Sequence, residues 1–328
     1  MASWQSNLIK FLMRQNLRTM DKLNIRVWDE NTSVDVWRNY CEDGAAKAKM
    51  LPGVETLPVE IPGLAKGLSA EWLQPITPAG VDAVIFYTHG GGYLSGSCSD
   101  HRALVSKLVA STMLPLLLFE YRLAPEHPFP AALDDTLTAY RWLLTQIEPS
   151  TQIVIAGESA GGGLCLGTLL ALKDLIEQGE TSLRLPVAGV SISPNTDMNL
   201  TGKPNIVKGS VEPLGMAEIC SKYYVGDNDP CHPYISPLYG DLYGLPPLLL
   251  TVGGDENALD DSVRFIAKAK EAGVDARLIV GQGQVHCYPL LPDFIPESKY
   301  AMGEIRDFIR MHVLPNQETH HQEMDNAI

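Results

Sequence analysis

The chain has 328 residues, 45% of them hydrophobic, which is enough to bury a large core in one α/β domain with or without a lid. Its formal net charge of −14, with no run of lysine or arginine, excludes nucleic acid as a partner, because phosphate binding needs clustered positive charge. Every apolar run is shorter than the roughly 20 residues that cross a membrane, and Lys10, Arg14 and Arg18 interrupt the segment where a secretion signal would lie. We therefore expect a cytoplasmic protein without a membrane span.

The first predicted element is an amphipathic helix near the amino terminus, in which apolar residues recur at helical spacing: Ile9, Leu12, Met13, Leu17 and Met20. Further along, apolar runs rich in β-branched residues alternate with longer amphipathic stretches. The runs predict strands over residues 82–89, 114–121, 152–157, 187–193, 246–254 and 275–281. The stretches between them predict helices over residues 101–112, 132–147, 161–179 and 260–273. This alternation predicts an α/β fold with a mostly parallel, doubly wound sheet.

Two segments do not fit the alternation, and we expect both to lie on top of the sheet. They are the helical residues 1–50 and the stretch 197–244, which is too long for an ordinary connection between strands. Residues 51–196 and 245–315 then form the two parts of the core. The polar residues 316–328 read as a disordered tail.

The residues Gly157-Glu158-Ser159-Ala160-Gly161 match the pattern GxSxG between a predicted strand and a predicted helix. Small flanking residues allow a sharp turn that lifts the serine hydroxyl out of the sheet. The pattern alone is a weak signal, but in this strand-turn-helix context it predicts Ser159 as a nucleophile.

A serine hydroxyl needs a base to take its proton, and the base needs an acid to hold its tautomer. The order serine, acid, histidine favours His286, which follows the last predicted strand, because His312 lies in a helical stretch and His320 and His321 in the tail. For the acid, Asp255 lies at the carboxyl end of a predicted strand, with Glu256 as the nearest alternative.

Three consecutive glycines follow the first of the predicted strands listed above. Backbone without side chains can approach a developing oxyanion, so we expect the N–H groups of Gly91, Gly92 and Ala160 to form an oxyanion hole. The six cysteines are scattered without metal-ligand spacing, and we expect reduced thiols, no metal and no cofactor.

Five motifs together resemble the hormone-sensitive-lipase-like branch of the α/β-hydrolases: HGGGY (89–93), YRLAPEHPFPAALDD (121–135), GESAGGG (157–163), SPLYGDL (236–242) and GGDENALDDS (253–262). The resemblance is strongest to microbial short-chain esterases and monoterpene ε-lactone hydrolases. It implies a sheet of about eight strands, a helical cap built from residues 1–50 and 197–244 over an acyl pocket, and a homodimer. It also implies that the residues around the glycines and the nucleophile contact substrate: His89, Gly90, Tyr93 and Glu158. Glu158 stands where this branch usually has aspartate, and Asn195 where an aromatic residue is common.

We therefore expect a serine carboxylesterase or lactonase whose partner is a small ester or lactone of short to medium acyl length. One alternative is an amide or formamide hydrolase of the kynurenine formamidase type, which can share the glycine motif and the same triad. The other is a non-catalytic small-molecule receptor, as the gibberellin receptor resembles this fold but lacks a working triad. The presence of Ser159, Asp255 and His286 together counts against the receptor.

Overall fold

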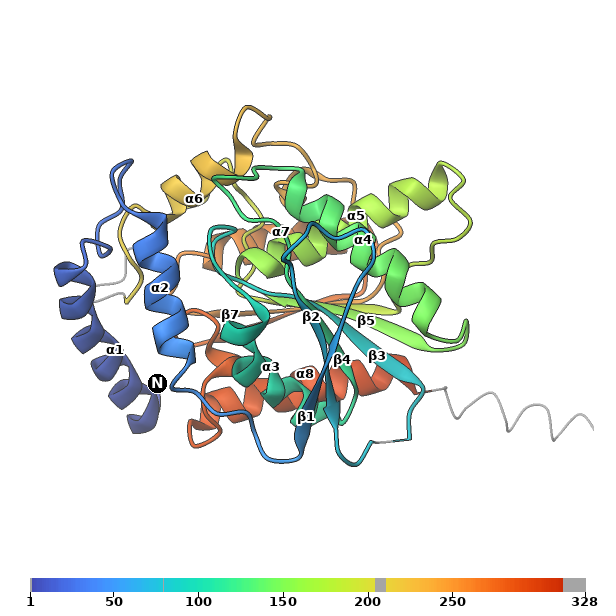
Figure 1. Ribbon diagram of the computed structural model, residues 1–328, viewed down its shortest axis with the longest axis horizontal. Helices are drawn as coiled ribbons and strands as arrows, with labels where there is room; N and C mark the ends of the chain where they lie inside the picture. The colour runs from blue at the N-terminus through green and yellow to red at the C-terminus, as the bar shows by residue number, and fades with distance from the viewer. Residues whose placement is uncertain (1, 79, 204–210, 315–328) are drawn as a thin grey trace, which may run out of the picture.

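The computed structural model describes residues 2–78, 80–203 and 211–314 and shows one eight-stranded sheet (Figure 1). The strand order is β1-β2-β4-β3-β5-β6-β7-β8. β2 (Ala70–Pro75) runs antiparallel to both of its neighbours, the edge strand β1 (Val54–Val59) and β4, and the other six strands are parallel to one another. Those six are β3 (Ala83–Thr88), β4 (Leu116–Phe119), β5 (Gln152–Glu158), β6 (Ala188–Ile192), β7 (Leu248–Gly253) and β8 (Ala276–Gly281).

The six parallel strands confirm the predicted ones, since each lies within a predicted range or extends one residue beyond it. β3, β4, β6 and β7 are buried along their whole length, which is why their sequences are continuous apolar runs. β1 and β2 were not assigned from the sequence. In β1 only Val54 is fully buried, and Leu57 is 54% exposed, so this edge strand carries little apolar signal.

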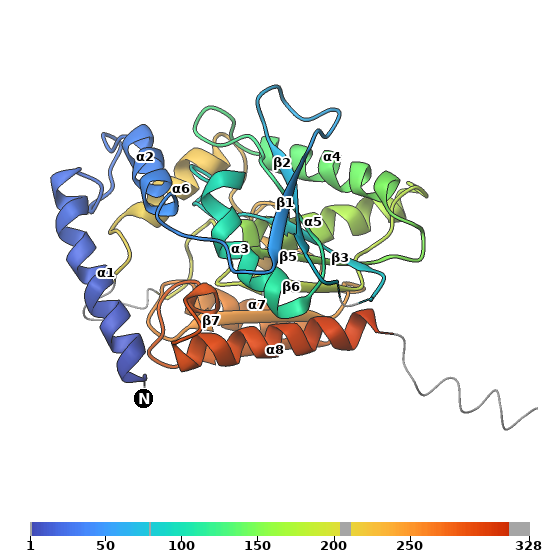
Figure 2. The same ribbon diagram turned by 60° about the horizontal axis from the view of Figure 1, so that its bottom comes forward.

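Helices cover both faces of the sheet, as Figure 2 shows. One face packs against α3 (Cys98–Thr112) and α8 (Pro296–Val313). The opposite face packs against α4 (Ala131–Gln146), α5 (Ala160–Glu177) and α7 (Leu259–Glu271). This arrangement confirms the predicted doubly wound α/β fold and directs the carboxyl ends of the parallel strands to one common edge.

The amino-terminal helices α1 (Trp4–Lys22) and α2 (Val34–Ala45) lie beside that edge, near α6 (Met216–Val225) of the segment 197–244 (Figure 1). The chain between α1 and α2 is joined to that segment by backbone hydrogen bonds, from the Trp28 N–H to the Leu214 carbonyl (2.7 Å) and from the Leu214 N–H to the Arg26 carbonyl (2.9 Å). The N-terminal segment and the segment 197–244, called the insert below, are therefore physically connected.

The apolar stripe of α1 is not buried as its spacing suggests. Of its five residues only Met20 is buried, and Leu12 is 49% exposed. Polar contacts attach the start of this helix instead: the Ser3 hydroxyl donates to Glu297 (2.8 Å) and the Ser6 hydroxyl to Gln284 (2.8 Å).

Within the part of the chain that the structure describes, no helix is long and apolar enough to cross a membrane. The tail 316–328, with His320 and His321, lies outside the described residues.

Candidate active site

Ser159 occupies the turn between β5, which ends at Glu158, and α5, which begins at Ala160. Its backbone has φ 56° and ψ −123°, a conformation that a non-glycine residue adopts only when the surrounding structure holds it. The turn is so tight that a β-carbon on Gly157 would clash with the Gly161 carbonyl, and one on Gly161 with the Thr88 carbonyl. The two glycines of the motif are therefore required by close packing around a raised, partly exposed serine.

The glycine loop after β3 lies against this turn. The Gly90 N–H donates to the Glu158 carboxylate (2.6 Å), and a β-carbon on Gly90 would lie 3.2 Å from the Ser159 β-carbon. Gly91 and Gly92 have φ values of 112° and 67°, in the region where residues with a β-carbon are strained. The structure thus brings the first of the three glycines to the nucleophile, and the oxyanion hole of Gly91, Gly92 and Ala160 stays a prediction.

Three of the predicted substrate-binding side chains are buried beneath this loop rather than displayed at a surface. Glu158 is 3% exposed and bonds His101 Nε2 (3.0 Å) as well as the Gly90 N–H. His89 is fully buried, and its Nδ1 lies 2.8 Å from the Gly90 carbonyl oxygen. Tyr93 is 1% exposed and stacks on another ring, that of Tyr224. These side chains hold the loop in place, and contact with substrate stays a prediction for all three.

The two buried imidazoles under the loop differ in charge preference. Burial, with the neighbouring His101, lowers the pKa of His89 to about 3, so His89 stays neutral. Burial also disfavours the charged form of His101, but the Glu158 carboxylate outweighs it and raises the pKa of His101 above its usual value. The residue that replaces the usual aspartate therefore has a definite partner, an ion pair with His101 that supports the loop.

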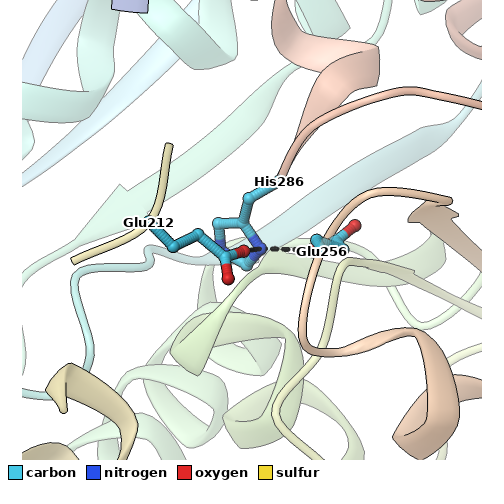
Figure 3. Close-up of side chains that lie close together, drawn as sticks. All are labelled: Glu212, Glu256 and His286. Carbon is cyan, nitrogen blue, oxygen red and sulfur yellow. Dashed lines mark hydrogen bonds and ion pairs between the residues drawn. The ribbon is translucent and has the colours of Figure 1, made fainter. Parts of the chain in front are cut away.

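His286 follows β8, and its Nδ1 is hydrogen-bonded to the Glu256 carboxylate (Figure 3). Glu256 is 1% exposed, and its other oxygen accepts from the Gly253 N–H and from the Ser193 hydroxyl (2.7 Å). These contacts fix the carboxylate in one position. It can hold the imidazole with Nδ1 protonated, which leaves the other ring nitrogen available as a base.

The prediction that Asp255 holds His286 is wrong in this structure, and the alternative, Glu256, holds it. The Asp255 carboxylate turns the other way, 3.3 Å from Lys10 Nζ of α1, and its side chain is 28% exposed. Its backbone N–H donates to the Gln284 carbonyl (2.9 Å). Neighbouring residues in a loop project in different directions, so only one of the two can point beneath the histidine.

Electrostatics around His286 favour its protonated form. Partial burial opposes a charge on the ring, but the hydrogen-bonded Glu256 carboxylate outweighs burial and raises the pKa of His286 above its usual value. Burial in turn raises the pKa of the Cys287 thiol, which keeps that sulfur neutral near pH 7. The charge that stabilises an imidazolium at this position is therefore the carboxylate of Glu256.

Ser193, directly after β6, joins the two halves of the site, and it was not predicted from the sequence. Its hydroxyl donates to Glu256 (2.7 Å) and accepts from the Cys287 N–H (3.0 Å). The residue before it, Ile192, accepts from the Ser159 N–H (2.8 Å). A serine at the carboxyl end of a parallel strand was the available signal, because those ends converge at one edge.

One further carboxylate lies at the histidine, that of Glu212 in the insert, with Oε1 3.9 Å from Nδ1 (Figure 3). Among the described residues, Glu212, Glu256 and His286 are the group whose potential metal-ligand atoms lie within 4.8 Å of one another. A metal there would have to displace the proton that Nδ1 shares with Glu256, so the hydrogen bond argues for an acid–base assembly instead.

A cavity of about 1270 Å³ separates the amino-terminal helices from α3 and borders the glycine loop. Apolar and polar residues share its lining, which includes Leu23, Tyr40, Leu104 and Leu290 as well as Gly91. The space adjoins the predicted oxyanion hole from the side of α2, where a bound molecule would contact residues of the N-terminal segment.

Comparison with known proteins agrees with this geometry. A family model described as the alpha/beta hydrolase fold matches residues 85–290. An acetyl-hydrolase of Streptomyces hygroscopicus is 36% identical over 246 residues, which cover 74% of this chain and 79% of that protein. An esterase of Acinetobacter venetianus is 30% identical over 310 residues, covering 93% and 96%.

Among solved structures, an esterase from the bacterial hormone-sensitive lipase family superposes with a TM-score of 0.82 at 35% identity, covering 96% of this chain and all of that one. The names of these relatives confirm the prediction of an enzyme of the carboxylesterase class. The chain belongs to the α/β-hydrolase fold family, in its hormone-sensitive-lipase-like branch.

Proposed function

We propose that this protein hydrolyses carboxylic esters of short to medium acyl chains through an acyl-enzyme on Ser159. The observation that carries the proposal is a strained, raised serine at the same edge of the sheet as a histidine whose Nδ1 is held by a buried carboxylate. Acetyl esters are the first substrates to test, because a relative that covers most of this chain is named an acetyl-hydrolase.

In the first half of the reaction, Ser159 Oγ attacks the ester carbonyl carbon and His286 takes the hydroxyl proton on Nε2. The carbonyl oxygen becomes an anion, which the N–H groups of Gly91, Gly92 and Ala160 stabilise. Collapse of the tetrahedral intermediate breaks the ester C–O bond, and His286 returns its proton to the leaving alkoxide, which departs as an alcohol. Glu256 keeps the imidazole oriented and stabilises its positive charge throughout.

In the second half, water attacks the acyl-enzyme carbonyl while His286 removes a proton from the water. The second tetrahedral intermediate releases the carboxylic acid, and Ser159 recovers its proton from His286. Each proton that leaves a nucleophile is delivered to a leaving group, so the site needs neither a cofactor nor a metal for this chemistry. A lactone would follow the same steps, with the alcohol remaining attached to the product.

Comparing substrates on the wild-type protein tests the proposal. We expect the fastest turnover with p-nitrophenyl esters, tested from acetate to dodecanoate. The ε- and γ-lactones should follow, and N-formylkynurenine should be the slowest. Preference for N-formylkynurenine would instead indicate a formamide hydrolase, and saturable binding without turnover would indicate a receptor. The Ser159→Ala variant should lose at least about a thousandfold in ester turnover while keeping the fold, since the oxyanion hole and binding cannot replace the nucleophile.

A further inference from the structure

We propose that Glu212 of the insert is a positioning residue for His286, a second carboxylate that stabilises the imidazolium and joins the catalytic base to the insert. The inference rests on the proposed role of His286 as the base. It assigns Glu212 no contact with substrate.

The geometry around Nδ1 of His286 carries the proposal. Glu256 is hydrogen-bonded to this nitrogen, and Glu212 Oε1 lies 3.9 Å from it, as Figure 3 shows. The Glu212 side chain is only 20% exposed, and its Oε2 lies 3.4 Å from the Asn257 N–H, one residue beyond Glu256. Two carboxylates therefore approach one imidazole from different segments of the chain.

The insert holds Glu212 in this place through the N-terminal segment. Leu214, two residues further on, exchanges backbone hydrogen bonds with Arg26 and Trp28 at 2.9 and 2.7 Å. Trp28 is itself 4% exposed and donates its indole N–H to the Ile25 carbonyl (2.9 Å). The Glu212 carboxylate thus projects from backbone that the N-terminal segment anchors.

The other titratable groups around His286 do not supply this second charge. Lys10 of α1 faces this region but lies against the Asp255 carboxylate (3.3 Å), so these two charges offset each other. Burial raises the pKa of Cys287 and of Tyr288, and both stay uncharged near pH 7. Among the described residues, the carboxylates that pair with His286 Nδ1 are those of Glu212 and Glu256.

The pKa of Glu212 is consistent with this crowding. Burial raises it, the nearby Glu256 carboxylate raises it further, and His286 lowers it. A carboxylate that gains from a positive imidazole must by reciprocity favour that imidazole's protonation. Removing the Glu212 charge should therefore lower the pKa of His286. It should also reduce stabilisation of the imidazolium that forms when Ser159 gives up its proton.

Glu212→Gln tests the inference, with Glu218→Gln as a matched control. Glu218 is an exposed acid in the first turn of α6 of the same insert, so its replacement removes the same charge without altering the surroundings of His286. On p-nitrophenyl acetate between pH 5 and 9, Glu212→Gln should reduce kcat about tenfold and change KM less than about twofold, because the interaction strengthens as charge forms. Its acid limb should move to lower pH by on the order of 0.5 to 1 unit. Glu218→Gln should match the wild type in kcat, in KM and in the position of the acid limb.

NMR titration of the His286 ring gives a readout that does not need turnover. The pKa of His286 should fall in folded Glu212→Gln and stay at the wild-type value in Glu218→Gln. Glu212→Asp keeps the charge on a shorter side chain, so its His286 pKa should lie between those of Glu212→Gln and the wild type. This variant still tests the inference if Glu212→Gln fails to fold. An unchanged pKa and an unchanged kcat in folded Glu212→Gln would overturn the inference while wild-type ester turnover still supported the proposed function. Absence of wild-type turnover would overturn the proposed function instead.

Discussion

Removing the negative charge from Glu256 and, separately, from its neighbour Asp255 tests the assignment of the catalytic acid most sharply. Glu256→Gln keeps the shape of the buried side chain. Its amide oxygen can still accept from the Gly253 N–H and the Ser193 hydroxyl, as the Glu256 carboxylate does now. Its amide nitrogen then faces Nδ1 of His286 and, being a donor, forces Nδ1 to act as the acceptor.

That reversal moves the imidazole proton to Nε2, the nitrogen that must receive the proton of Ser159. The wrong tautomer, together with the lost charge, should reduce kcat by about ten-thousandfold, or ~5 kcal/mol of transition-state stabilisation. KM should change little, because Glu256 is 1% exposed and is hydrogen-bonded to Ser193 and His286.

Asp255→Asn is the matched control, since it removes the same charge one residue away. Its carboxylate pairs with Lys10 across 3.3 Å and is 28% exposed, and partly exposed ion pairs of this kind contribute about 1 kcal/mol or less. We expect kcat within about threefold of the wild type. Steady-state and pre-steady-state turnover of p-nitrophenyl acetate measure both, with circular dichroism to check the fold. A large loss in Asp255→Asn together with a small one in Glu256→Gln would refute the assignment drawn from the structure.

Three further measurements follow from the same geometry. Gly91→Val should lower kcat far more than it raises KM, because the added β-carbon would clash with the Ser95 carbonyl and displace the glycine loop. An unchanged kcat with weaker substrate binding would indicate a ligand pocket without catalysis. On the acid side, kcat/KM should rise with pH through a midpoint above the ordinary imidazole pKa of about 6.5, because the raised pKa of His286 shifts formation of its neutral, basic form to higher pH. A midpoint below pH 6 would contradict the raised pKa. Removing residues 1–45 should lower acetate turnover, because α1 contacts the loop that carries His286, and should lower butyrate turnover further, because this segment lines the cavity beside the glycine loop. An equal loss on both esters would place the segment away from the acyl group.

The sequence predicted the central sheet well because its strands are buried on both faces. The run at 248–253, for example, is entirely buried and reads as continuous apolar residues. The edge strand at 54–59 was not predicted, because most of its residues are partly or fully exposed. Burial does not account for every strand, because β2 was missed although four of its six residues are buried, and β8 was predicted although only its two end residues are buried.

The sequence could not identify the catalytic acid for a different reason. Motif order and strand ends narrowed the choice to Asp255 and Glu256, but which of two neighbouring loop residues points beneath the histidine depends on tertiary contacts. Here those contacts are the Gly253 N–H and the Ser193 hydroxyl on one side and Lys10 on the other. Lys10 lies 245 residues away in the chain, beyond the reach of any local pattern.

The same reasoning explains why Glu158 could be singled out as unusual but not given a partner from the sequence. Its carboxylate meets the Gly90 N–H and His101, from two segments that come together only when β3 and α3 pack around β5. The longer side chain of glutamate reaches an imidazole under the loop. Substituting aspartate, the usual residue of this branch, would shorten that reach and loosen the ion pair with His101.

The N-terminal segment contacts each part of the site through a different residue. Trp37 of α2 donates its indole N–H to the Ser95 hydroxyl (3.0 Å) beside the glycine loop, and Ser6 of α1 donates to Gln284 (2.8 Å), two residues before His286. Trp28, between the two helices, bonds Leu214 of the insert (2.7 Å). Since a misplacement of about 1 Å at a reacting group can cost a hundredfold in rate, a segment that supplies no catalytic atom can still govern turnover. Because its three contacts reach the glycine loop, the loop of the proposed base His286 and the insert, any shift of this segment should change the relative positions of all three.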